Sequence, residues 1–74
     1  MTAAHTATVT VTVNGEQREL PAGRTLDDVV ADLTAAPSGV AAAVNEAVVP
    51  RGRWSRAVLA DGDRVEVLTA VQGG

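Results

Sequence analysis

The residues that most clearly could take part in covalent chemistry are Gly73 and Gly74, which end the sequence. Glycine has no Cβ, so a backbone built from it enters a narrow cleft and leaves its carbonyl carbon open to attack. A terminal carboxylate has a pKa of about 3.5, so at neutral pH it is an anion that repels nucleophiles until it is activated. We therefore expect covalent chemistry at Gly74, access to it through Gly73, and a partner enzyme that supplies ATP and magnesium for an acyl-adenylate.

Two residue types that carry covalent catalysis are absent. All six basic residues are arginine, and the chain contains neither lysine nor cysteine. It therefore has no Schiff-base nucleophile, no Walker A phosphate loop, no disulfide, no thiolate metal ligand and no means of carrying a persulfide. His5 is the single imidazole, and it lies in residues 1–7, which we expect to form a disordered N-terminal extension. We expect the chain to be no enzyme and to bind no metal or cofactor itself.

The charge distribution argues against nucleic-acid and membrane partners. The net charge is -3 at pH 7, and the arginines are scattered and often near acids, so no basic stripe is available for a phosphate backbone. The longest uninterrupted apolar stretch, Val40 to Val44, is far shorter than the ~18 residues that a membrane span needs. The N-terminus has no cationic segment followed by an apolar run. We expect a cytoplasmic protein with a mildly acidic face that suits a basic partner protein.

The first half of the chain predicts a hairpin and a helix. Residues 8–13 alternate threonine and valine, which is typical of a half-buried strand. The Asn14-Gly15 pair suits a type I′ turn, so residues 16–20 are predicted to pair back antiparallel. A turn that contains Pro21 then ends this strand. The apolar stripe of the helix that follows is predicted to be Leu26, Val29, Val30 and Leu33.

Thr25 is predicted to be the N-cap of this helix, with Asp28 three residues later as an acidic variant of the capping box. Asp27 and Asp28 also complement the positive end of the helix dipole. The Pro37-Ser38-Gly39 segment is predicted to break the helix.

The second half predicts three more elements. Residues 40–45 are small and rich in valine and alanine, which favours a central strand buried on both faces. A very short strand at residues 48–49 is ended by Pro50. Residues 51–59 are ambiguous, since their apolar side chains fit either a helical turn or a lid over the core. Residues 61–63, Asp-Gly-Asp, are predicted to form a tight turn because they lack the ligand series of an EF-hand loop.

The last strand is predicted at residues 64–70, where Val65 and Val67 alternate with Glu66, Leu68 and Ala70. Leu68 is then either covered by a loop or part of an exposed patch for a partner. Residues 71–74 are predicted to be a flexible tail that extends about 13 Å beyond the sheet. The possible partner contacts are Leu68, Ala70, Val71, Gln72 and Arg51.

The order of these elements predicts one domain at residues 8–70 with a ubiquitin-like β-grasp architecture. In this α+β fold a mixed sheet of four to five strands packs against one main helix, and the first and last strands lie together at its centre.

Several short motifs resemble one known family. The Val44-Asn45 pair, the Val-Pro-Arg run that ends at Arg51, Trp54, the Asp-Gly-Asp turn and the terminal Gly-Gly together resemble the ThiS family of sulfur-carrier proteins of thiamine biosynthesis. The similarity extends from Val9 to Gly74. The chain departs from the family in its residues up to Ala7 and in the arginine-rich segment around Gly52 and Arg53.

The resemblance implies a function and a set of partners. It implies adenylation of Gly74 by an E1-like adenylyltransferase, conversion to a thiocarboxylate with sulfur from a cysteine desulfurase route, and delivery to thiazole synthase. For Trp54 and Arg51 we favour structural roles, a core lid and a surface charge, over partner recognition.

Three alternatives use the same fold. The chain is alternatively the small subunit of a molybdopterin synthase, or a ubiquitin-like modifier that forms isopeptide bonds through Gly74. The fourth hypothesis is a binding module whose tail has no chemical role.

Overall fold

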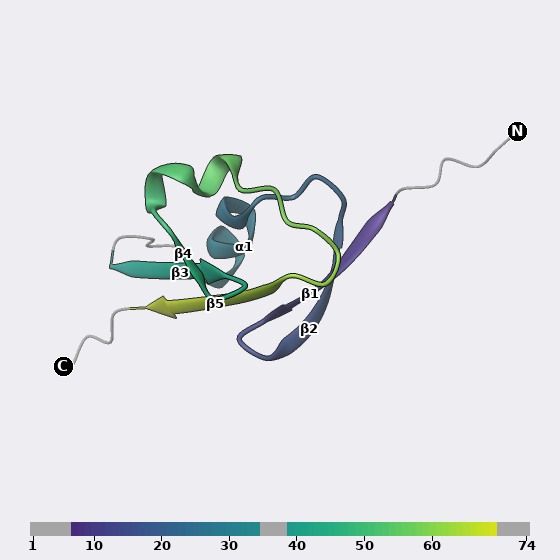
Figure 1. Ribbon diagram of the computed structural model, residues 1–74, viewed down its shortest axis with the longest axis horizontal. Helices are drawn as coiled ribbons and strands as arrows, with labels where there is room; N and C mark the ends of the chain where they lie inside the picture. Colours follow the sequence, from purple (N-terminus) through teal and green to yellow (C-terminus); the bar gives the residue numbers. More distant parts are fainter. Residues whose placement is uncertain (1–6, 35–38, 70–74) are drawn as a thin grey trace, which may run out of the picture.

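A computed structural model describes residues 7–34 and 39–69. The elements in chain order are β1 (Thr8–Val13), β2 (Glu16–Pro21), α1 (Leu26–Leu33), β3 (Val40–Val44), β4 (Ala47–Val49), the 3-10 helix η1 (Arg51–Arg56) and β5 (Arg64–Thr69). The strands form one five-stranded mixed sheet in the order β2-β1-β5-β3-β4 (Figure 1). The predicted α+β architecture is confirmed, and so is the central pairing of the first and last strands.

The opening hairpin forms where the sequence predicts it. Asn14 and Gly15 both have positive φ, at 52° and 84°, as the primed turn between β1 and β2 requires. β1 and β2 pair antiparallel along their whole length, from Thr8 opposite Pro21 to Val13 opposite Glu16. The hairpin therefore supplies β1 as the pairing partner for β5, the strand that lies beside it.

Helix α1 begins with the predicted capping box. The Thr25 hydroxyl accepts a hydrogen bond from the Asp28 N–H, and the Asp28 carboxylate accepts one from the Thr25 N–H. Three residues of the predicted stripe, Leu26, Val29 and Val30, are buried, and Leu33 is half-buried. The helix ends at Leu33, before the segment that contains the predicted break.

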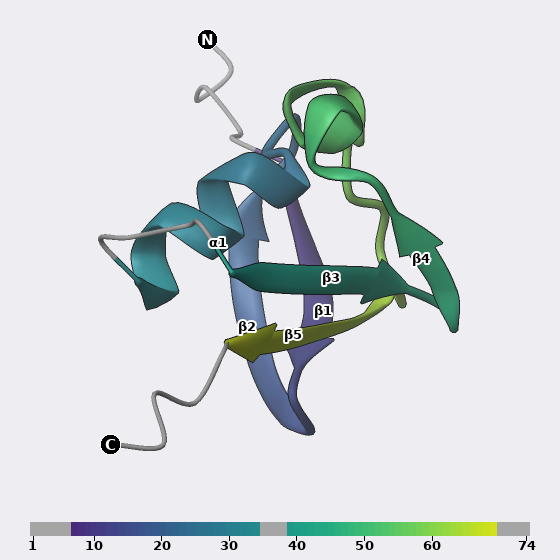
Figure 2. The ribbon, with the colours of Figure 1, turned by 90° about the vertical axis from the view of Figure 1, so that its left-hand side faces the viewer.

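Helix α1 covers one face of the sheet (Figure 2). Its buried residues meet the inward valines of β1 and β5, together with Ala42, Trp54 and Leu59. The opposite face of the sheet is open. The prediction that β3 is buried on both faces is therefore wrong: Ala42 is buried, but Ala41 is exposed. Because alanine exposes little apolar surface, a run of alanines does not require a cover on both faces.

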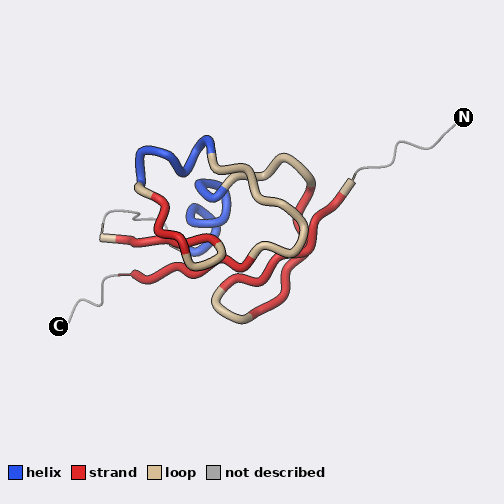
Figure 3. Tube along the Cα trace, viewed as in Figure 1, coloured by secondary structure: helices blue, strands red, loops and turns tan. Residues whose placement is uncertain are grey.

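The ambiguous segment after β4 resolves into η1 and a loop. Trp54, on η1, is 2% exposed, and its indole Nε1–H donates to the carbonyl of Val49 at 2.8 Å. Leu59 is also buried, whereas Val58 is exposed. Trp54 thus has the predicted role of a core lid, and η1 packs beside α1 (Figure 3).

The predicted N-terminal extension lies almost wholly outside the described residues. At its inner end the Ala7 carbonyl accepts a hydrogen bond from the Ala22 N–H at 2.9 Å. The predicted tail, residues 71–74, lies outside them entirely. Within the described ranges, no helix has the length and apolar content needed to cross a bilayer.

Candidate functional site

β5 is the strand that leads into the C-terminal segment, and it lies at the centre of the sheet. Its start pairs in parallel with β1, with Thr12 opposite Arg64 and Val13 opposite Val65. On its other side it pairs antiparallel with β3, from Val44 opposite Val65 to Val40 opposite Thr69. Val65 and Val67 face the core, as the alternation predicts. β5 is therefore fixed on both sides before the chain reaches residue 70.

The Asn14 side chain hydrogen-bonds to β5 on the side where β1 lies, beyond the last β1–β5 residue pair. Its Oδ1 accepts from the Val67 N–H at 2.8 Å, and its Nδ2 donates to the Val67 carbonyl at 3.2 Å. One amide thereby replaces a strand residue and satisfies both main-chain groups of Val67. The sequence predicts the turn at Asn14 but gives no sign of this contact.

The turn before β5 is fixed by its two acids. Asp61 accepts a hydrogen bond from the Thr10 N–H at 2.7 Å, and Asp63 accepts one from the Ala60 N–H at 2.8 Å. Asn45 joins the same turn, since its Nδ2 donates to the Asp63 carboxylate and its Oδ1 accepts from the Arg64 N–H, both at 2.9 Å. Both carboxylates accept hydrogen bonds from backbone N–H groups, which is a structural role in a tight turn. Among the described residues, no group of three or more histidines, cysteines or acids could hold a metal ion.

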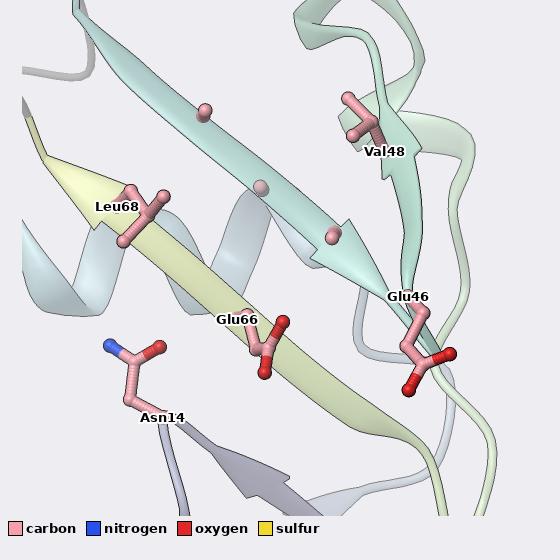
Figure 4. Close-up of a pocket in the computed structure, with 8 residues that line it drawn as sticks. Asn14, Glu46, Val48, Glu66 and Leu68 are labelled. Carbon is pink, nitrogen blue, oxygen red and sulfur yellow. The ribbon is translucent and has the colours of Figure 1, made fainter.

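The open face of the sheet carries a shallow groove of about 610 Å³. Leu68 on β5 and Val48 on β4 are its large apolar side chains, and they are 72% and 76% exposed. They stand on either side of β3, where Leu68 is opposite Ala41 and Val48 is opposite Ala43. Small residues between two large ones produce the hollow. We name this surface, with Glu46, Glu66 and Asn14 at its edge, the sheet-face groove (Figure 4).

The charged residues that line the groove, Glu46 and Glu66, are acidic. Glu46 pairs with Arg64 at 3.2 Å, and both side chains are mostly exposed, so the ion pair adds little stability. Glu66 lies between Leu68 and Glu46 in the view of Figure 4. An exposed apolar hollow with an acidic edge is suited to an apolar side chain from a partner, flanked by basic groups.

The structure separates the predicted contact residues. Leu68 is exposed and lines the groove, so no described loop covers it, and its contact with a partner stays a prediction. Arg51 is exposed on η1 and does not line the groove. Ala70, Val71, Gln72, Gly73 and Gly74 lie outside the described residues. Sequence reasoning missed Val48, because a strand of only three residues gives too short an alternation to assign a face.

The geometry of β5 and the order of the strands agree with the comparisons. The ThiS family model matches residues 11–74. The chain belongs to the ThiS family. It is 30% identical over 61 residues to the sulfur carrier protein ThiS of Escherichia coli, a match that covers 82% of this chain and 92% of the relative.

Two further proteins similar to this ThiS-family chain differ in how much of their own length it covers. Over 62 residues it is 40% identical to a thiazole synthase of Magnetococcus marinus, which covers 84% of this chain but 19% of that protein. Among solved structures, it is similar to the thiamine biosynthesis protein ThiS from Geobacter metallireducens, with a TM-score of 0.71 and 26% identity, covering 89% of this chain and 100% of the other. The predicted β-grasp fold is thereby confirmed.

Proposed function

We propose that this chain is the sulfur carrier for thiazole formation in thiamine biosynthesis and that it carries sulfur as a thiocarboxylate at Gly74. The family match through residues 11–74 supports this most directly, because it includes both terminal glycines. In this role the chain is the protein substrate of other enzymes. It is no catalyst itself.

The chemistry begins at the Gly74 carboxylate. An E1-like adenylyltransferase uses ATP and magnesium to convert it to an acyl-adenylate, with loss of pyrophosphate. A sulfur nucleophile that originates from cysteine desulfurase then attacks the acyl carbon and displaces AMP, which takes one carboxylate oxygen with it. This nucleophile is a persulfide of the donor, so its attack forms an acyl disulfide. A thiol reductant cleaves the S–S bond, is oxidised to a disulfide, and leaves the thiocarboxylate at Gly74. Thiazole synthase receives the sulfur. We propose a cytoplasmic location, which is compatible with the need of the adenylyltransferase for ATP.

The folded body has two tasks in this proposal. β5 is held by β1, β3 and the Asn14 amide, so the direction in which the chain leaves the sheet is fixed up to Thr69. The sheet-face groove then offers Leu68 as a contact close to the tail. We propose that Ala70, Val71 and Gln72 follow this contact into the partner and that Gly73 gives Gly74 access to the reacting groups.

The test is an intact-mass measurement. The chain is incubated with the adenylyltransferase, ATP, magnesium and a sulfur donor, beside a known carrier as positive control and a chain without Gly74 as negative control. We expect the full chain to exchange one oxygen for one sulfur, with the change located at Gly74. An unchanged mass, under conditions in which the known carrier is converted, would sink the proposal.

A further inference from the structure

The helix η1 concentrates positive charge that the carrier chemistry does not use. Three of the six arginines lie within its six residues, and all nine acids lie elsewhere. We name Arg51, Arg53 and Arg56 the arginine cluster; all three are exposed. Within residues 7–34 and 39–69 the ion pairs are Arg18–Glu16 and Arg64–Glu46. No carboxylate in those ranges therefore neutralises the cluster.

The backbone beneath the cluster is held in place. Trp54 is buried and donates to the Val49 carbonyl, so it fastens the middle of η1 to the end of β4. The Arg53 N–H donates to the Pro50 carbonyl at 2.8 Å, and the Ala57 N–H donates to the Trp54 carbonyl at 3.3 Å. A partner that binds the arginines must order their side chains but not the main chain, which lowers the entropic cost of association.

The cluster is separated from the sheet-face groove by a single strand. β4 lies at the edge of the sheet, and its neighbouring residues point to opposite faces. Val48 lines the groove, whereas Val49 lines a second hollow of about 340 Å³ together with Arg53, Arg56 and Ala57. A partner that wraps around the β4 edge contacts both surfaces.

The chemistry of the cluster selects an acidic protein surface. A guanidinium is always charged at neutral pH, and its fork of donors matches a carboxylate in bidentate fashion. A nucleic acid would fit less well, because α1 packs beside η1 and carries Asp27, Asp28 and Asp32, and the whole chain has a net charge of -3. Carboxylates on a folded partner can be placed to meet the arginines without approaching these aspartates.

We propose that the arginine cluster is a second docking site, which binds an acidic surface of the thiazole synthase while the sheet-face groove contacts the same enzyme. This inference rests on the proposed carrier function. The choice of enzyme follows from the match of this chain to about a fifth of the length of two thiazole synthases, from Magnetococcus marinus and Paramagnetospirillum magneticum. In those proteins a segment similar to this chain and the synthase share one polypeptide.

The experiment compares two variants that each lose two positive charges. Arg53→Gln/Arg56→Gln alters the cluster, and Arg18→Gln/Arg24→Gln removes two arginines that lie outside η1 and line neither the sheet-face groove nor the second hollow. Dissociation constants for the thiazole synthase and the adenylyltransferase of the same organism are measured by calorimetry, without ATP or a sulfur donor. We expect the cluster variant to raise the Kd for the synthase about tenfold and the control variant less than about threefold. Added salt should weaken the wild-type complex more than the cluster variant.

Each other outcome overturns the proposal. It fails if both variants change the Kd equally, if the synthase does not bind, or if only the adenylyltransferase is affected. It also fails if the cluster variant weakens binding to a single-stranded oligonucleotide but leaves the Kd for the synthase unchanged. The carrier function is scored separately by mass at Gly74: sulfur exchange with equal Kd values rejects the docking site alone, and cluster-dependent binding without exchange rejects the carrier step alone. Circular dichroism melts of both variants check that they fold.

Discussion

Asn14 and Asn45 occupy turn positions with nearly the same positive φ, 52° and 51°, and each uses its side-chain amide on main chain far along the sequence. The Asn14 amide contacts Val67 in a partly buried setting. The Asn45 amide contacts Asp63 and Arg64 in an exposed setting. A lost hydrogen bond costs more where water cannot replace it.

We therefore predict that Asn14→Gly lowers the free energy of unfolding by about 1–3 kcal/mol and Asn45→Gly by less than about 1 kcal/mol. Glycine is the matched substitution because it adopts positive φ and removes the side-chain amide, and its effect on the unfolded chain is similar at the two positions. Urea unfolding, followed through the fluorescence of the single Trp54, gives both values. Equal losses would show that the burial of the Asn14 contact is unimportant.

Asn14 shows which features can be predicted from the sequence and which cannot. The turn at Asn14-Gly15 is a local property, since both residues tolerate positive φ, and it is confirmed. The contact from Asn14 to Val67 spans 53 residues, and no spacing rule indicates it. Trp54 was ambiguous for a related reason: its burial depends on where β4 and α1 lie, and not on its neighbours in the chain.

Among the elements, α1 has an N-terminal cap whose contribution to stability depends on pH, because the Asp28 carboxylate takes part in it. A hydrogen bond from the Thr25 backbone N–H to the Asp28 carboxylate is the main cause that lowers the pKa of Asp28 below 3.8, the ordinary value for aspartate. The folded state therefore holds this proton less tightly than the unfolded state does. The cap stabilises the fold fully above about pH 4, and this contribution is lost as the pH falls through the lowered pKa.

The corresponding variant is Asp28→Asn, which keeps the side-chain shape and cannot ionise. We expect it to be less stable than the wild type at about pH 7, and we expect the difference to be smaller at about pH 2.5, because Asp28 gains a proton as the pH falls through its lowered pKa. Urea midpoints at the two pH values measure this difference. Asp32→Asn removes the same charge from the helix without touching the cap. A stability difference that behaves alike in both variants would contradict the role of the cap.

Element boundaries were predicted best where a local signal sets them. The Thr25 cap and the Val-Thr alternation of β1 depend on residues three or fewer apart, and both are confirmed. The face of β3 was predicted wrongly, because a run of apolar residues is compatible with one covered face as well as two. Which face α1 covers is decided by the whole sheet.

At the scale of the whole molecule, the sheet has one face for folding and one for recognition. The covered face holds the valines of β1 and β5 against α1, and the open face holds Val48 and Leu68. The element order predicted the central position of β5 correctly, because the β-grasp topology places the last strand beside the first. The composition of the open face could not be predicted until the pairing of β3 with β4 and β5 was known.

Two leucines test this division with the same chemical change. Leu26 is 0% exposed, so Leu26→Ala should lower the free energy of unfolding by about 2–5 kcal/mol, a large part of the roughly 4–11 kcal/mol available to a domain of this size. Leu68 is 72% exposed, so Leu68→Ala should change it by no more than about 0.5 kcal/mol. Urea unfolding measures both.

In a functional assay we expect the opposite order, with Leu68→Ala more harmful than Leu26→Ala to the folded protein. In sulfur loading of Gly74, Leu68→Ala should raise the KM for this chain several-fold without altering its unfolding midpoint, because the lost methyl groups contact the partner and not the core. Leu26→Ala, assayed at a temperature where its folded fraction is known, should load in proportion to that fraction, because its groove is intact whenever it is folded. A wild-type KM for Leu68→Ala would show that the adenylyltransferase does not dock on the sheet-face groove and would leave the tail as its main recognition element.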